Sequence, residues 1–141
     1  MDISVEDGTI PEKLAQVAAK KNLQAEIYES QTLGDLKAAL KRGDTVILDI
    51  QAWADGSPLP WRDTWEDGHY VVLAGMDKNN IFVMDPSVHS GYGYIPKHEF
   101  VDRWHDYDQS GVSIRHHYHL ALFIHGSKPV SRFPASAIKI N

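Results

Sequence analysis

One histidine and one aspartate stand where they could work as a pair. His69 opens an apolar run, Tyr70–Gly75, and Asp85 closes a second run, Ile81–Met84. An imidazole held by a carboxylate is the base half of a nucleophile–base–orienter triad, in which the acid fixes the tautomer and the imidazole moves the proton. The alternative is structural: a histidine at a strand end, and an aspartate that starts a turn before Pro86. The local sequence leaves both interpretations open.

These two residues can meet only if the two runs form a hairpin. The polar segment 77–80 between the runs is rich in turn-forming residues and predicts two antiparallel strands. A turn centred near Asp77 puts His69 opposite Asp85, and a centre one residue later leaves them diagonal on one face. A register between these two puts them on opposite faces, because a one-residue slip inverts a strand. We expect a favourable register, with the pair at an open end of the sheet where a ligand has room.

Two helices and two strands are predicted ahead of the hairpin. Each helix begins at a capping-box pattern, Thr9 with Glu12 and Thr32 with Asp35. The helices are expected over Pro11–Lys21 and Leu33–Lys41, and the strands over Gln24–Tyr28 and Thr45–Ile50.

The second half of the chain is less regular. We expect a brief strand at Tyr94-Ile95, a helix that begins at Pro96 and breaks at Asp106–Gly111, and one long strand over Ile114–Ile124. The segment 126–141 shows no clear period and is expected to be an extended tail. Residues 1–141 are expected to form a single domain.

A long connection between the buried strand and the hairpin carries three tryptophans. Loops of this length are usually functional when they are ordered. Trp53 and Trp65 could wall a substrate cleft, or equally could anchor the loop. Gln51 could donate a hydrogen bond to an oxyanion, although an amide that stabilises the loop is the commoner role. We therefore predict these three residues as substrate-binding candidates.

Composition excludes several classes of function. The net charge of −5 and the scattered basic residues argue against nucleic acid and anionic membranes as partners. No apolar run reaches the roughly 18 residues of a membrane-spanning helix, so membrane insertion is not expected. The acidic start Met1–Asp7 is unlike a signal peptide, and we expect a cytoplasmic protein. The absence of cysteine excludes disulfides, thiolate metal sites and a cysteine nucleophile within this chain.

Eight histidines raise the question of a metal site. In a strand, His117 and His119 share a face and could chelate zinc or nickel. No acidic residue accompanies them at ligand spacing, and this pattern is more often a surface or cross-strand pair. We expect no metal and no cofactor.

Taken together, five segments resemble the bacteriocin-processing peptidase family. They are DGTIPEKLAQVAAKKNLQAE, TLGDLKAAL, TVILDIQAW, DGHYVVLAGMDKNNIFVMDPS and GYIPKHEFVDRWHD. That family consists of papain-like cysteine peptidases that cut leader peptides, often after a double glycine. The resemblance runs from Gly8 to about Ile124, and it implies His69 as general base and Asp85 as the residue that orients it. It also implies an α+β fold, with a papain-like core and a twisted, mainly antiparallel sheet.

The nucleophile of that family has no counterpart here. By the resemblance, it is a cysteine on a helix that precedes the region aligned with Gly8, with a glutamine just before it. We therefore expect a bacterial peptidase-like domain that lacks the nucleophile helix and does not cleave its peptide or protein substrate. The alternative is a non-catalytic module that binds peptides on the same fold. An in-frame glutamine–cysteine segment ahead of Met1 would favour the enzyme.

A missing helix has a physical consequence. It would leave an apolar groove exposed beside His69, and such patches recruit a partner or a second copy of the chain. Self-association into a homo-oligomer is therefore expected.

Overall fold

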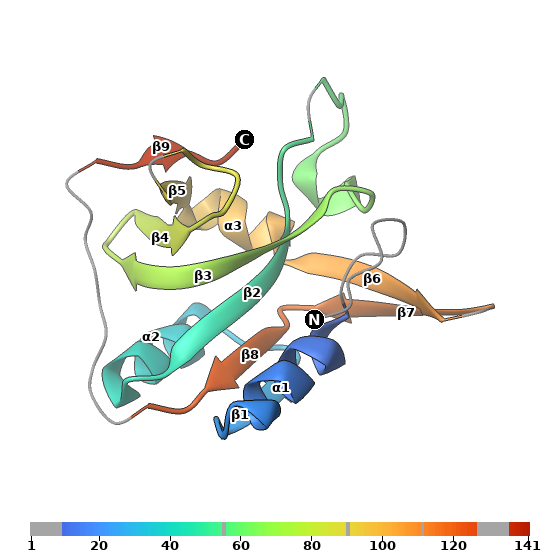
Figure 1. The fold of residues 1–141 in the computed structure, drawn as a ribbon. Coiled ribbons are helices and arrows are strands. Elements are labelled where there is room, and N and C mark those ends of the chain that lie inside the picture. Colours follow the sequence, from blue (N-terminus) through green and yellow to red (C-terminus); the bar gives the residue numbers. More distant parts are fainter. Residues whose placement is uncertain (1–9, 55, 90, 111, 127–135) are drawn as a thin grey trace.

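The computed structural model describes residues 10–54, 56–89, 91–110, 112–126 and 136–141. These residues form a seven-stranded sheet in the order β1-β8-β2-β3-β4-β5-β9, and a separate two-stranded sheet, β6-β7, that extends to one side of it (Figure 1). Every strand pairing in the large sheet is antiparallel except the one between β5 and β9. The predicted α+β class with a mainly antiparallel sheet is confirmed.

The helices are α1 (Pro11–Lys20), α2 (Leu33–Arg42) and α3 (Lys97–Arg103), with a short 3₁₀ helix, η1 (Trp61–Asp63). The strands are β1 (Ala25–Tyr28), β2 (Thr45–Gln51), β3 (Gly68–Met76), β4 (Asn80–Met84), β5 (Tyr92–Pro96), β6 (His105–Ser110), β7 (Ser113–Tyr118), β8 (Ala121–Ile124) and β9 (Ile138–Lys139). In the described part of the chain, no helix is long and apolar enough to cross a membrane.

The start of α2 follows the predicted capping box. The Thr32 side chain accepts from the backbone N–H of Asp35, the Asp35 side chain binds the backbone of Thr32, and Gly43 closes the helix at φ 89°. The start of α1 differs from the prediction. Its N-cap is Ile10, which makes no side-chain capping bond, and Thr9 lies outside the described residues. Glu12 instead forms an ion pair with Arg115.

The main core lies on one face of the large sheet. Alternate residues of β2, Val46, Leu48 and Ile50, are fully buried there with Leu36 of α2 and Phe100 of α3. The residues between them point to the opposite face, because side chains alternate along a strand. That opposite face is covered by the small sheet, which contacts β2 and β3 through β6.

A β-bulge sets the register of the central hairpin. Next to the turn, Met76 pairs with Ile81, and straight continuation of that ladder would pair Val72 with the residue after Met84. The register shifts between Leu73 and Gly75, so that Val72 pairs with Met84 instead. A slip of one residue moves every side chain of a strand to the other face of the sheet. The extra residue at the bulge therefore returns the alternate side chains in the first half of β3 to the face that packs on the core.

Three expectations for the second half of the chain are wrong. Asp106–Gly111 was expected only to break the helix, but α3 already ends at Arg103 and His105–Ser110 forms strand β6. The expected single strand over residues 114–124 is two strands in different sheets, β7 and β8, because the chain turns at His119, whose φ is 52°.

The predicted tail is also partly structured. Residues 127–135 lie outside the described part, but residues 138–139 form β9 and Ile140 is fully buried. Its side chain lies against Gly93, where an added Cβ would clash with it.

Candidate active site

The structure brings His69 and Asp85 together. Nε2 of His69 lies 2.7 Å from Oδ1 of Asp85, and their side chains are 19% and 0% exposed. In the bulged register Asp85, the residue after Met84, lies beyond the Val72–Met84 pair and diagonal to His69. This is the second of the two favourable registers that the sequence allowed. The pair therefore sits on the core-facing side of the sheet, at the end of β3 and β4.

Asp85 is held by two further donors. The backbone N–H of Ser87 donates to Oδ1 at 2.8 Å, and the indole Nε1 of Trp53 donates to Oδ2 at 3.2 Å. The backbone of the same aspartate is fixed by a turn, in which its N–H donates to Gly91 and its carbonyl accepts from Val88. Both carboxylate oxygens are therefore oriented before any ligand arrives.

The contact to Asp85 also decides which nitrogen of His69 can act. Because Nε2 faces a carboxylate, a neutral imidazole carries its proton on Nε2 and its lone pair on Nδ1. Among the described residues, no group forms a hydrogen bond with Nδ1. The arrangement can therefore accept a proton at Nδ1 while the ring orientation is maintained by Asp85.

Trp53 reaches this pair from the connection after β2. Its backbone adopts a left-handed conformation, at φ 62°, and its N–H donates to the carbonyl of Asn141. Its side chain packs against the main core while its indole N–H reaches Asp85. The structure thus brings this predicted residue to the His69–Asp85 pair.

A match to a protein family agrees with this geometry. The model of the peptidase C39 family matches residues 4–108. The chain belongs to the peptidase C39 family. The crystal structure of a candidate C39-like peptidase from Bacillus anthracis is similar, with a TM-score of 0.61 and 23% identity. That match covers 86% of this chain and 62% of the other, so this chain spans less than two thirds of that protein. No curated protein matches the chain.

Gln51 of this C39 domain does not reach the candidate site. It follows Ile50 on β2 and therefore points to the opposite face of the sheet from His69. Its side chain is fully buried, donating to the His105 carbonyl and to Asp106 at 3.1 Å each and accepting from the backbone of Asp67 at 2.8 Å. In this structure Gln51 therefore lies away from His69, and its contacts match the loop-stabilising alternative.

Trp65 also lies away from His69. Its ring packs against the small sheet, 4.3 Å from the His105 ring and edge-on to His116 and Tyr118. In the described part of the chain it anchors the loop and makes no contact with the catalytic candidates. The cleft-wall prediction for this residue is not supported, and the anchor alternative fits.

Arg103 is a supporting residue that the sequence interpretation missed. Fully buried, it donates to the carbonyl of Gln51 at 3.0 Å and to that of Ile140 at 2.8 Å, and its guanidinium lies 3.9 Å over the Trp61 ring. Burial lowers its pKa to about 10, although Glu99, one helical turn earlier, opposes the shift. Arg103 thus connects α3 with Trp61, in the loop between β2 and β3, and with Ile140 near the end of the chain. The Glu–x₃–Arg spacing on α3 was the only available signal.

The apolar residues next to His69 in the sheet are buried. Ile50 and Val71, which flank His69 in the sheet, are 0% and 1% exposed. They belong to the same buried cluster as Ile140, and Trp53 packs against that cluster. The sheet beside His69 is therefore covered at these two positions.

The opposite face of the sheet holds a second acid–imidazole contact. Asp49 Oδ2 lies 3.4 Å from His117 Nε2, and both residues are almost fully buried. Neither ring nitrogen of His117 has a hydrogen-bond partner among the described residues, and neither does Oδ1 of Asp49. Burial raises the pKa of Asp49, with the nearby Asp106 adding to the shift, and burial lowers the pKa of His117. Both residues therefore favour their neutral forms.

His117 and His119 lie in different surroundings. His117 is buried next to Asp49, whereas His119 stacks on Trp104 at 4.6 Å and bonds the Gln31 carbonyl at 3.0 Å. Within the described residues, no group of three or more acidic or histidine side chains could hold a metal ion.

Proposed function

We propose that this C39 domain keeps the base half of a cysteine-peptidase site, with His69 as general base and Asp85 as the residue that orients it. The observation that carries the proposal is the 2.7 Å contact between His69 Nε2 and Asp85 Oδ1. It leaves Nδ1 to take a proton from a thiol placed beside it. Trp53 and Ser87 support the arrangement by fixing the carboxylate.

The 141-residue chain does not hydrolyse peptides by itself in this proposal. The attacking species in cysteine-peptidase chemistry is a thiolate, and the sequence contains no cysteine. Among the described residues, no serine or threonine hydroxyl bonds His69 in its place. The ligand class that fits a C39 domain is a peptide.

Imidazole NMR tests the base assignment directly. With ¹⁵N-labelled histidine, His69 is expected to show the Nε2–H tautomer near pH 8, and Asp85→Asn is expected to change that tautomer balance. His98, which is on α3 rather than at the site, serves as the internal control. A His69 ring protonated on Nδ1 in the unmodified chain would contradict the proposed role.

A cleavage assay tests the inactivity. Peptides that carry a Gly-Gly pair, the sequence the resemblance implies, are expected to survive incubation with the chain as they do with His69→Ala. Cleavage that disappears in His69→Ala would overturn the inactivity and support the base. If the gene encodes an in-frame cysteine segment ahead of Met1, the longer chain is expected to cleave. In that chain His69→Ala should cost on the order of 10²-fold or more.

The lack of a thiol favours a second function, peptide binding without cleavage. Trp53 is the natural reporter, because its indole contacts Asp85. Binding of the same Gly-Gly peptides is expected to change the tryptophan fluorescence of the wild type. The change should be lost in Trp53→Phe and kept in Trp65→Phe. Loss of the fluorescence change in both variants, or in neither, would show that the peptide does not bind at this site.

A further inference from the structure

Arg103 binds the backbone of two segments that are distant in the sequence. Its Nε donates to the carbonyl of Gln51 at 3.0 Å, and its Nη1 donates to the carbonyl of Ile140 at 2.8 Å. The first carbonyl belongs to the last residue of β2, and the second to the residue after β9. Because the N–H groups of a guanidinium form a rigid, planar fork, Arg103 fixes these two carbonyls relative to each other.

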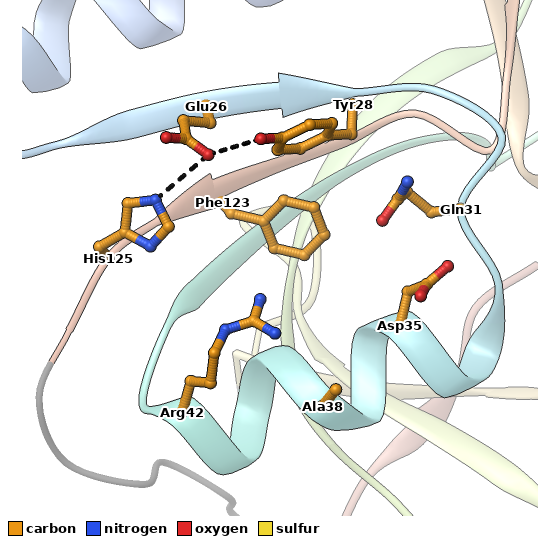
Figure 2. A pocket seen from close by; sticks show the side chains of 8 residues that line it. All are labelled: Glu26, Tyr28, Gln31, Asp35, Ala38, Arg42, Phe123 and His125. Carbon is orange, nitrogen blue, oxygen red and sulfur yellow. Dashed lines mark hydrogen bonds and ion pairs between the residues drawn. The ribbon is translucent and has the colours of Figure 1, made fainter.

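An exposed arginine elsewhere in the chain shows what is unusual about Arg103. Arg42 projects from α2 into a trough of about 380 Å³ between α2 and β1 (Figure 2). Its side chain is 55% exposed, and it binds the carboxylate of Asp44 at 3.0 Å. The side chain of Arg103 is 0% exposed, and its Nη2 has no hydrogen-bond partner among the described residues. Burying a guanidinium is unfavourable, so its place here needs a reason beyond filling space.

Trp53 lies between the two segments that Arg103 holds. Its N–H donates to the carbonyl of Asn141, the residue after Ile140, and Gln51 precedes it by two positions. Its φ of 62° is a left-handed conformation, which is unfavourable for a residue with so large a side chain. Such a conformation persists only where the surrounding contacts fix it. The carbonyls bound by Arg103 are next to the contacts that do so.

The left-handed conformation of Trp53 directs its indole to the catalytic candidates. The indole Nε1 donates to Oδ2 of Asp85 at 3.2 Å, and Oδ1 of the same carboxylate lies 2.7 Å from His69 Nε2. A return of φ to the ordinary range would turn the side chain away and remove this donor. The orientation of Asp85 against His69 therefore depends on the backbone contacts around Trp53.

We propose that Arg103 is a positioning residue, which holds Trp53 in the conformation that orients Asp85 against His69. Among the described residues, no hydrogen bond or ion pair joins Arg103 to Asp85 or to His69, so it acts through Trp53. This role rests on the base function proposed for His69, whereas the conformation of Trp53 can be measured independently of that function.

The charge of Arg103 offers a second route to the same carboxylate. Burial lowers the pKa of Arg103, while Glu99 and, more weakly, Asp85 oppose the shift, so Asp85 lies within electrostatic reach. Arg103→Lys separates the two routes. It keeps the positive charge, but lysine has a carbon where arginine has Nε, and the bond to the Gln51 carbonyl is lost.

Hydrogen exchange at the indole N–H groups tests the effect on Trp53. Trp104 is the internal reference, because its Nε1 is also bonded and donates to the carbonyl of Leu120 at 2.8 Å. In Arg103→Lys, exchange at Trp53 is expected to be at least about tenfold faster, while exchange at Trp104 changes by less than about threefold. Equal acceleration at both indoles, or no acceleration at Trp53, would overturn the proposal.

Two control variants should leave the ratio of the two exchange rates unchanged. Arg42→Lys makes the same substitution at an exposed arginine, and Glu99→Gln weakens the ion pair of Arg103 without touching its carbonyl bonds. A change in either control as large as that in Arg103→Lys would contradict the role of the carbonyl bonds. If Arg103→Lys does not fold, Trp61→Leu takes its place, because it removes the ring that covers the guanidinium. It should accelerate exchange at Trp53 selectively, by about threefold, and an unchanged ratio would overturn the proposal.

The ¹⁵N shifts of His69 test whether the effect reaches the site. Arg103→Lys is expected to change them in the same sense as Trp53→Phe, and to add nothing in the double variant. No change at His69, or a change that persists in the double variant, would contradict a role through Trp53. The two proposals fail separately. A His69 ring protonated on Nδ1 would remove the base function alone, and unselective exchange at Trp53 would remove the role of Arg103 alone.

Discussion

The two faces of the central sheet each hold an aspartate beside a histidine, and the two pairs differ in how their carboxylates are hydrogen-bonded. Asp85 takes part in three hydrogen bonds, one of them with His69 at 2.7 Å. On the other face, Asp49 and His117 stay 3.4 Å apart, with no hydrogen bond to either ring nitrogen among the described residues. Neutral forms are favoured on that face because burial penalises both charges.

The difference between the faces teaches that residue types and proximity do not by themselves make a catalytic pair. Around Asp85, backbone and indole donors compensate for the loss of water. Around Asp49, burial disfavours ionisation most, and a second carboxylate, Asp106, disfavours it further. A carboxylate can orient an imidazole only where its charge is stabilised.

Asp85→Ala should have the largest effect. It leaves the indole of Trp53, the N–H of Ser87 and the His69 ring without their buried acceptor, and we expect a loss of about 3–5 kcal/mol in the free energy of unfolding. Urea denaturation at pH 7 measures it. A loss below about 1 kcal/mol would mean that the three donors find water instead.

Trp53→Phe should have a smaller effect on the same pair. It keeps an aromatic ring but removes one donor to a buried carboxylate, which costs about 2 kcal/mol. Trp65→Phe is the matched control, because that ring only packs against the small sheet, and it should cost less than half as much. Equal losses for the two variants would contradict the special role of the indole N–H at Asp85.

Asp49→Asn should have the smallest effect and the opposite sign. The pKa of Asp49 is raised in the folded state, so its contribution is fully present below the unfolded pKa and is lost as pH rises through the folded pKa. Removing the charge should therefore stabilise the protein by about 1 kcal/mol at pH 8 and change it little near pH 4. Urea denaturation at both pH values checks this. Destabilisation at pH 8 would indicate a working ion pair with His117.

The sequence predicts the parts that depend on local patterns. The Thr32–Asp35 capping box, the alternating apolar residues of β2 and the turn-rich segment 77–80 each specify their element without help from the rest of the chain. The same hairpin places His69 and Asp85 at neighbouring strand ends, so the pair itself could be foreseen.

Other features depend on tertiary contacts and could not be predicted in this way. The bulge between Leu73 and Gly75 decides which face His69 occupies, and the sequence interpretation did not predict this bulge. Strand β6 has a polar sequence and pairs with β7, far enough along the chain that the pairing is not evident locally. Its sequence therefore resembled a helix break. The position of Gln51 could have been inferred, since it alternates with the core residue Ile50.

The link between Trp53 and Asn141 has a practical consequence for anyone who produces this protein. The carbonyl of Asn141 accepts from the same residue whose indole binds Asp85, and Arg103 holds the preceding carbonyl. An affinity handle fused after Asn141 would begin at the residue whose carbonyl binds the backbone of Trp53. Handles for purification therefore belong at the other end of the polypeptide, or need removal before any assay.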